Sequence, residues 1–511
     1  MNSRQGLALP GAGSFLLLAA SCTLAPAPSV PEPVAELPES FERAEEADVY
    51  EAREWWTAFQ DPALNTVIDS VLVANFDLAE AVARVRQARA QAGIARAALL
   101  PSVQAGATAS DQDSPSNVGV GQQFRDIVGD SLFGNALPDR LGIRTWSLGI
   151  DFAYELDFWG RARNDRLAAG HEYLASESDY HAARIGVLAE TIATYFEIAD
   201  LRRREALARE TVDVLLERME LSETRYDRGL ITSFELYQLR QELRNTQAAL
   251  PQLESRSVDA EGRMAVLLGG FRDKLDAILP DSLAPIPSDD PVAAGVPADL
   301  LAQRPDVRSA GLRLEAARFS IGARRAELLP SLSLSGTIGV QSSEADGLFK
   351  VDQWFSNLLG NLTAPIFQGG RIRSNIDLAQ ARFDQLAAAY GRTVVTAVHE
   401  VEAALAALGN QGLRHDFLVS QRDEAFASVE LQSRRYAAGV GGYIDYLDAV
   451  RALLGVESTL AGARRDLALA RLALHRSLGG DWTEPPDSEG RRMLTATLSE
   501  GSGPRTGGQS R

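Results

Sequence analysis

The sequence predicts a mainly helical protein with a β-stranded portion that fits a membrane barrel, built from one large unit that occurs twice. Three observations support this fold class. Two very long stretches contain no proline and repeat apolar residues at helical spacing. Shorter stretches alternate apolar and polar residues, which is typical of strands. Motifs of the first half recur in the second half at a nearly constant offset.

The duplication is clearest in two glycine-containing segments, "RYDRGLITSFELYQLR" and "RYAAGVGGYIDYLDAV", which begin at Arg225 and Arg435. The two starting positions are 435 − 225 = 210 residues apart. The motifs "LLGG" (267–270) and "SLGG" (477–480) have the same offset. A repeat of this size indicates a duplicated large unit rather than a solenoid of short repeats. We expect a first repeat over 51–270, a linker over 271–298 and a second repeat over 299–482.

The N-terminus reads as a secretory signal over 1–21, with the apolar run "FLLLAA" and small residues before Cys22, the chain's one cysteine. This pattern resembles a bacterial lipoprotein cleavage site, although Ala19 stands where leucine is usual. An ordinary signal peptide with an incidental cysteine is the alternative. We expect Cys22 to be lipidated, 22–50 to be a proline-rich tether, and 483–511 to be a disordered tail.

Each repeat contains two predicted strands after a Leu-Leu-Pro motif. In "SLSLSGTIGV" (331–340) and "TWSLGIDF" (145–152), apolar side chains fall on one face and polar side chains on the other. Weaker strand signals follow Pro101 and surround "NLLGNLTAPIF". The alternation fits a membrane β-barrel as well as a half-buried soluble sheet, and the secretory signal favours the barrel.

The long helices are expected from Arg161 to Asp227 and from Arg371 to Ala437. Their apolar residues follow 3–4 spacing with a stutter, as in coiled coils. At ~1.5 Å per residue, each helix would reach roughly 100 Å. A rod-like scaffold is the simple alternative. "RPDV" (304–307) is expected to be a rigid entry into a helix, and Trp55 and Trp56 to be packing anchors.

The predicted elements imply an oligomer. Unpaired strand edges in lipid cost several kcal/mol per backbone group, and single-chain barrels begin at about 8 strands. Four strands per chain therefore cannot close alone, and the amphipathic hairpins would bury their seams only against copies of themselves. The residues alone predict a homo-oligomeric tube, with strands in the membrane and helices beyond it.

Composition and motifs exclude several functions. The formal charge of −18 disfavours nucleic acid as a partner, because phosphate binding needs a basic surface. The five histidines have no metal-ligand spacing, and neither a phosphate-binding loop nor a G-x-S-x-G elbow occurs. We expect no enzyme activity, no metal and no cofactor.

The order of elements and four motifs resemble the outer-membrane efflux proteins, the TolC-like channels, and among them the NodT-type outer membrane factor lipoproteins of RND multidrug efflux systems. The motifs are "WWTAFQDPALNTVI", "RPDVRSAG", "LLPSLSLSG" and "RYAAGVGGYIDYLDA", and the resemblance covers roughly residues 50–482. It implies a homotrimer with a 12-stranded β-barrel in the outer-membrane lipid, continued by a long 12-helix α-barrel. It also implies a periplasmic adaptor and an inner-membrane RND-type pump as partners, in a Gram-negative cell.

The resemblance also assigns roles near the two glycine turns. It places Asp445 and Asp448 at the constriction of the closed pore and Tyr436 on the tyrosine that latches neighbouring coiled coils. Glu235 matches an aspartate of the first repeat and is counted with the gate residues. Gly441 stands where the family has a basic latch residue. A ring of carboxylates would repel itself and favour cations. The alternative is helix capping, because acids in a first turn favour the helix dipole and "TSFE" (232–235) matches a capping box. The turns would dock the adaptor through Gly229, Leu230, Gly439 and Val440.

The function predicted is a passive exit duct for drugs and small molecules. A duct for type I protein secretion or metal export is the first alternative. A non-conducting periplasmic coiled-coil scaffold is an alternative of a different class, disfavoured by the alternating strands.

Overall fold

The computed structural model describes residues 38, 40–41, 54–115, 140–275, 278–279 and 303–480. The predicted signal segment, Cys22 and the C-terminal tail lie outside the described residues, as do most of the tether and the linker. The chain forms two compact units. One contains residues 90–171 and 315–385, and the other contains 30–89, 172–314 and 386–511.

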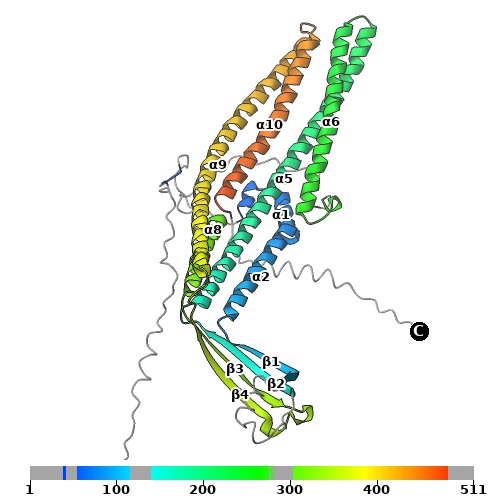
Figure 1. The fold of residues 1–511 in the computed structure, drawn as a ribbon. Helices are drawn as coiled ribbons and strands as arrows, with labels where there is room; N and C mark the ends of the chain where they lie inside the picture. Colours follow the sequence, from blue (N-terminus) through cyan, green and yellow to red (C-terminus); the bar gives the residue numbers. More distant parts are fainter. Residues whose placement is uncertain are drawn as a thin grey trace, which may run out of the picture. The chain divides into compact units, whose positions relative to one another are not determined.

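The first unit contains a four-stranded antiparallel sheet in the order β1-β2-β3-β4 (Figure 1). The four predicted strands are confirmed. Two short 3-10 turns, η3 and η4, lie between the last two strands. The bounds are β1 Ser102–Pro115, β2 Arg140–Leu156, β3 Ser331–Ser342, η3 Ala345–Gly347, η4 Val351–Gln353 and β4 Trp354–Thr363.

The strand register confirms the predicted alternation of faces. Ile150 pairs with Ile338 on one face, and both side chains are exposed at 50% and 58%. Asp151 pairs with Thr337 on the other face, where the threonine hydroxyl donates to the carboxylate at 2.5 Å. Antiparallel partners share a face, so the apolar side chains of neighbouring strands gather on one side of the sheet.

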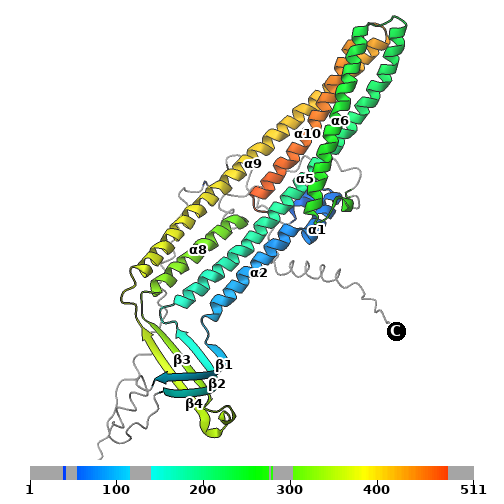
Figure 2. The ribbon, with the colours of Figure 1, turned by 45° about the vertical axis from the view of Figure 1, so that its right-hand side comes forward.

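The helices form two antiparallel hairpins, α5–α6 and α9–α10 (Figures 1 and 2). The long helices α5 and α9 have 67 residues each, and α6 and α10 have 35 each, so the two halves match in element length. Both predicted long helices are confirmed at their predicted ends. The bounds are η1 Trp55–Phe59, α1 Pro62–Ala74, α2 Phe76–Ala97, α5 Arg161–Asp227, α6 Ser233–Leu267, η2 Arg272–Lys274, α8 Pro305–Ala326, α9 Arg371–Ala437 and α10 Tyr443–Ser477.

The largest core lies in the second unit and includes both tryptophans of the "WW" motif. Trp55 and Trp56 are buried with Phe59 among side chains of α1, α5, α6 and α10, which confirms their packing role. In the same core, the Tyr195 hydroxyl donates to Asp61 at 2.7 Å, and burial raises the pKa of Tyr195. Asp61 also accepts two backbone N–H bonds at the start of α1. One carboxylate therefore caps a helix and ties it to α5.

The "RPDV" motif starts α8, as predicted, and also fastens it to α9 and α10. The buried Arg304 guanidinium lies 2.7 Å from both Asp306 and Glu400 and donates to the Ser477 carbonyl at 2.8 Å. Burial alone would lower the pKa of Arg304, but the two carboxylates more than offset it and raise the pKa. The contacts with Glu400 and Ser477 hold the start of α8 against the two other helices.

The N-terminal segment touches the helical unit at one described residue. Phe41 is 3% exposed and packs on α9 and the end of α10, beside Val401, Ala404, Leu474 and Leu478. Among the described helices, none combines the length and apolarity needed to cross a bilayer.

Candidate functional site at the hairpin turns

Two tight glycine turns end the long helices and position the predicted site residues. Gly229 and Gly439 have φ values of 69° and 75°, in the left-handed region where a side chain strains its own backbone and glycine does not. In both turns the glycine N–H and the next N–H donate back into the last helical turn, to Tyr226 and Arg225 and to Tyr436 and Arg435. The pattern is that of a Schellman motif, which stops each helix at the same place in its repeat.

The side chains that directly follow the two turn glycines are exposed to solvent. Leu230 and Val440 are 68% and 70% exposed, and an added Cβ at Gly229 or Gly439 would meet no atom within 4 Å. The predicted docking residues are therefore accessible in this chain.

The predicted capping box is only half formed in each repeat. Thr232 accepts from the Glu235 backbone N–H at 3.4 Å at the start of α6. At the start of α10 the roles reverse, and Asp445 accepts from the Gly442 N–H at 3.3 Å. Gly442 has no side chain, so its helix can have only this reciprocal half of the box. Asp445 thus caps α10, as the capping alternative predicts.

Asp448 has a different environment from Asp445, although both lie in the first two turns of α10. Asp448 is exposed and lies 3.4 Å from Arg451, whose guanidinium also lies 3.2 Å from Glu242 on α6. Exposed pairs of this kind contribute about 1 kcal/mol or less. The nearby cation offsets part of the acidic charge that the sequence predicts here.

Tyr436 belongs to an aromatic cluster that joins the two hairpins. Its ring stacks on Tyr446 at 6.3 Å and lies 5.5 Å from Tyr443. Arg225 of α5 lies over the Tyr436 ring at 5.0 Å. Arg218 of α5 lies over the Tyr446 ring at 4.6 Å and donates to its hydroxyl at 2.8 Å. The predicted latch residue therefore contacts the first hairpin of its own chain.

Leu447 of α10, the residue after Tyr446, is buried against the first hairpin. It packs among five side chains of α5 and α6: Leu215, Met219, Leu236, Leu239 and Leu243. Burial of the neighbouring Tyr443 raises the pKa of its hydroxyl. The contact between hairpins is thus apolar in its centre and polar at its ends.

Sequence reasoning missed Arg218, Arg225, Tyr446 and Arg451. The signal that could have found the aromatic part is the spacing of Tyr443 and Tyr446, which puts two tyrosines one helical turn apart just beyond a glycine turn. Arg218 and Arg225 carry no such signal, because they lie on α5, more than two hundred residues before their partners Tyr446 and Tyr436. Arg451 does carry a local signal, because it follows Asp448 by three residues on α10.

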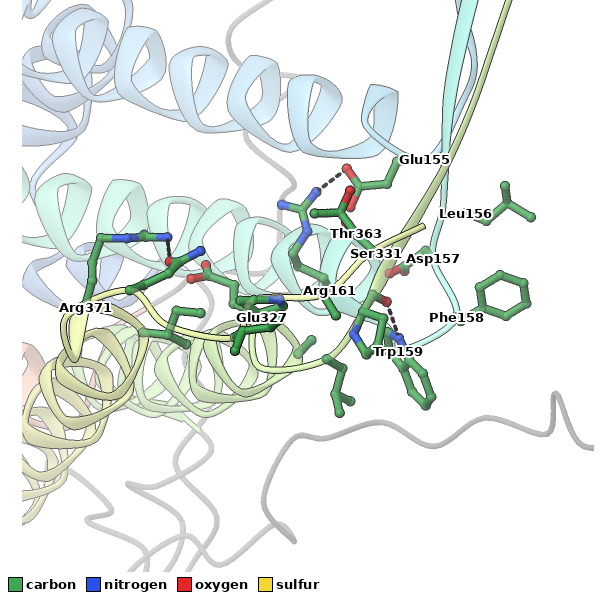
Figure 3. Close-up of a pocket in the computed structure, with 18 of the residues that line it drawn as sticks. Glu155, Leu156, Asp157, Phe158, Trp159, Arg161, Glu327, Ser331, Thr363 and Arg371 are labelled. Carbon is green, nitrogen blue, oxygen red and sulfur yellow. Dashed lines mark hydrogen bonds and ion pairs between the residues drawn. The ribbon is translucent and has the colours of Figure 1, made fainter. Parts of the chain in front are cut away.

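A cavity of about 810 Å³ lies in the first unit, where the strands meet the helices that follow them (Figure 3). The Trp159 indole N–H donates to the Pro330 carbonyl at 2.7 Å, and Arg161 pairs with Glu155 at 2.9 Å. These contacts join the end of β2 and the start of α5 to the segment before β3. Within the described part of the chain, no group of three metal-ligating side chains occurs.

Long helical hairpins combined with a four-stranded sheet that exposes an apolar face define a class of outer-membrane channel proteins. Comparison with known proteins agrees. The family model "Outer membrane efflux protein" matches residues 67–270 and 296–480. The chain therefore belongs to the outer membrane efflux protein family, and it is an efflux channel of the Gram-negative outer membrane.

Individual relatives cover nearly the whole chain. The outer membrane protein OprJ of Pseudomonas aeruginosa is 32% identical over 477 residues, 92% of this chain and 96% of its own length. The pyoverdine export outer membrane protein OpmQ of the same species is 30% identical over 475 residues, with the same coverage. The crystal structure of the Campylobacter jejuni CmeC channel matches with a TM-score of 0.82 at 26% identity, covering 92% of this chain and 99% of that one.

Proposed function

We propose that three copies of the chain form the exit duct of a tripartite efflux system. The observation that carries this proposal is the sheet. Its edge strands β1 and β4 each pair with a single neighbour among the described strands, and its apolar face is bare. A lipid-exposed sheet needs closed edges. Three copies with four strands each give a 12-stranded barrel, and their hairpins give a 12-helix barrel, the two repeats spanning 51–270 and 299–482.

The duct is passive in this proposal, with a periplasmic adaptor and an inner-membrane RND-type pump as partners. The exposed turns around Leu230 and Val440 support docking of an adaptor there. The cargo consists of small molecules, as the relative named for pyoverdine export supports. Cys22 anchors the N-terminus in the membrane as a lipidated residue.

The periplasmic end of the duct carries the gate. Asp445, Asp448 and Glu235 lie just beyond the turns, and symmetry would bring three copies of each around one axis. Their carboxylates favour cations and repel one another. The Tyr436 cluster offsets this repulsion by holding the two hairpins of each chain together.

The test is single-channel conductance of the purified protein in a planar bilayer, with the Asp445→Asn, Asp448→Asn double variant beside the wild type. Asparagine removes the charge and keeps an oxygen that can cap α10. We expect a small cation-preferring conductance in the wild type and at least a twofold loss of selectivity in the variant.

Each other result has a distinct meaning. An unchanged selectivity keeps the duct and rejects the acidic gate. No conductance from inserted trimers supports the scaffold. Conductance selective for a metal ion, or dependent on an unfolded polypeptide cargo, supports the metal-export or protein-secretion alternative.

A further inference from the structure

The two repeats differ in the charges at the junction between a strand and the long helix that follows it. In the first repeat, two arginines begin α5, and each has an acidic partner. Arg161 lies 2.9 Å from Glu155 (Figure 3), and Arg163 lies 3.6 Å from Asp157. Both carboxylates belong to the end of β2 and the turn after it. The positive charge at the start of α5 is therefore balanced within the chain.

The offset of 210 residues shows which residues occupy the same places in the second repeat. Both arginines are kept, as Arg371 and Arg373 at the start of α9. Both acids are lost, because Pro365 and Phe367 stand in their places. In the part of the chain that the structure describes, neither arginine has an acidic partner, and Arg371 donates to the amide oxygen of Gln368 instead. The second repeat thus leaves two positive charges unbalanced where the first repeat balances them.

Arg371 lines the cavity of about 810 Å³ at this junction, together with apolar side chains. Phe158, Ile366 and Phe367 belong to the same lining and are exposed, Ile366 almost completely at 98%. The cavity therefore brings a cation without an acidic partner close to solvent-exposed apolar groups. Its volume lies within the range of about 300–1,000 Å³ that is usual for small-molecule sites.

The other charged side chains of the cavity are paired within the chain. Glu155 and Asp157 have the arginines of α5, and Glu327 pairs with Arg324. Arg371 therefore gives the cavity a net positive charge. A guanidinium binds the oxygens of a phosphate or carboxylate in two parallel hydrogen bonds, and the apolar neighbours favour an anion that carries hydrocarbon. This combination is the chemistry of an anionic lipid.

The position of the cavity along the sheet fits a lipid headgroup. Trp146 and Trp354 are exposed near the opposite end of the sheet, where both pair with the end of β3. From Trp146 to Leu156, at the junction, β2 advances 156 − 146 = 10 residues. At ~3.3 Å per residue and a tilt of ~40°, this distance spans roughly 25 Å, the height of the apolar band of a membrane barrel. Phe158 and Trp159 follow directly, where such barrels have an aromatic girdle at the headgroups.

We propose that this cavity binds the headgroup phosphate of an anionic phospholipid from the inner leaflet of the outer membrane, and we call it the junction lipid site. Arg371 pairs with the phosphate, and Arg373 in the same helical turn adds to the positive potential. The acyl chains lie along Phe158, Ile366 and Phe367. A lipid phosphate thus supplies the negative charge that the second repeat has lost. The inference rests on the placement of the sheet in the membrane proposed above, and it adds one lipid partner to each copy.

Native mass spectrometry of the full-length protein in detergent tests the junction lipid site. The probes are dioleoyl phosphatidylglycerol, which is anionic, and dioleoyl phosphatidylcholine, which has the same acyl chains and no net charge. We expect one retained phosphatidylglycerol per copy and at least a fivefold preference over phosphatidylcholine. Inorganic phosphate in large excess should not displace the lipid, because it lacks the acyl chains that contact the apolar side chains.

Substitutions on α9 and in the turn before it identify the residues of the site. Arg371→Gln removes the cation and should lower the occupancy by phosphatidylglycerol at least fivefold. Phe367→Asp restores the acid of the first repeat and should lower the occupancy further than Phe367→Asn, which has the same shape without the charge. Arg382→Gln is the matched control, because Arg382 is also exposed on α9 and donates to a glutamine amide, that of Gln385 at 3.1 Å. This control should retain the lipid as the wild type does.

The outcomes separate the junction lipid site from the proposed duct. Equal retention of the two lipids overturns the site and is the result expected if a neighbouring copy covers the apolar groups. Equal occupancy in Arg371→Gln and Arg382→Gln overturns it as well, and displacement by inorganic phosphate reduces it to a site for small anions. None of these results affects the conductance test of the duct. Selective binding of phosphatidylglycerol to protein that stays monomeric in detergent supports the lipid site and contradicts the proposed trimer.

Discussion

His475 is a buried residue whose protonation should weaken the fold. It lies near the end of α10, 5% exposed, with its ring stacked on Trp55 at 5.1 Å. Burial, together with the smaller effect of the Arg471 charge, lowers the pKa of His475 to about 4. The unfolded chain has a histidine pKa of about 6.5, so between pH 6.5 and pH 4 it binds a proton that the folded chain excludes.

The consequence is a loss of stability on acidification. The contribution of His475 is complete above pH 6.5 and declines through pH 4, by up to about 3 kcal/mol. We expect the His475→Gln variant to lose much of the fall in thermal midpoint that the wild type shows between pH 7 and pH 4.5. Thermal denaturation monitored by circular dichroism at both pH values measures this fall in midpoint. The exposed His399 provides the control: His399→Gln should keep the wild-type slope, and equal slopes in all three proteins would exclude this role for His475.

The hydrogen-bond partner of a residue can be predicted from the sequence when it is local, and not when it lies on another hairpin. Asp445 lies where the repeat offset places it, and its backbone bond to Gly442 is local, so capping was predictable. Tyr446 and Arg218 are 228 residues apart, and their bond exists because two hairpins pack side by side. Sequence pattern reports local spacing, whereas such pairs depend on packing angles that no local pattern encodes. Arg451, by contrast, follows Asp448 by three residues on the same helix, so this missed ion pair is local and its spacing could have revealed it.

At the scale of elements, the turn glycines give a prediction about helix ends. Gly439 has φ 75°, and an added Cβ would meet no atom within 4 Å, so Gly439→Ala costs only backbone strain. That strain is about 1–2 kcal/mol. Gly455 lies inside α10 with equally open space, so Gly455→Ala should stabilise by up to about 1 kcal/mol.

Thermal unfolding of the two alanine variants measures this difference, and the opposite shifts in midpoint serve as mutual controls. A rise in midpoint for Gly439→Ala would mean that the turn tolerates a different conformation. The conductance should also change only for the Gly439 variant, because its strain lies at the proposed gate.

The secondary-structure elements were more predictable from the sequence than the contacts between them. The ends of α5 and α9 follow from Gly-Arg at the start and a glycine turn at the end, which are local signals. The strands follow from alternation of residues such as Ile338 and Thr337, because the pleat alone sets which face each side chain takes. The split capping box was not predictable in detail, because a matching motif does not determine which of its two bonds forms.

At the scale of the whole molecule, the sheet of a single chain leaves its apolar face exposed. Exposed apolar side chains cover one face, including Leu148, Ile150 and Ile338, and the opposite face has the Asp151–Thr337 bond. A soluble sheet would bury its apolar face against helices. A barrel in lipid instead turns that face outward and needs strands from other copies at β1 and β4.

This orientation predicts opposite effects of one substitution on the two faces of β3. Ile338→Arg puts a charge on the apolar face, which costs about 2–4 kcal/mol near mid-bilayer. Ser335→Arg puts the same charge three residues away on the polar face, which would line the aqueous lumen. We expect Ile338→Arg to reduce insertion into liposomes at least tenfold, while Ser335→Arg inserts normally and lowers cation selectivity. Co-flotation with liposomes measures insertion. Normal insertion of Ile338→Arg together with failure of Ser335→Arg would mean that the faces are reversed, and equal insertion of both would mean that this sheet does not meet lipid.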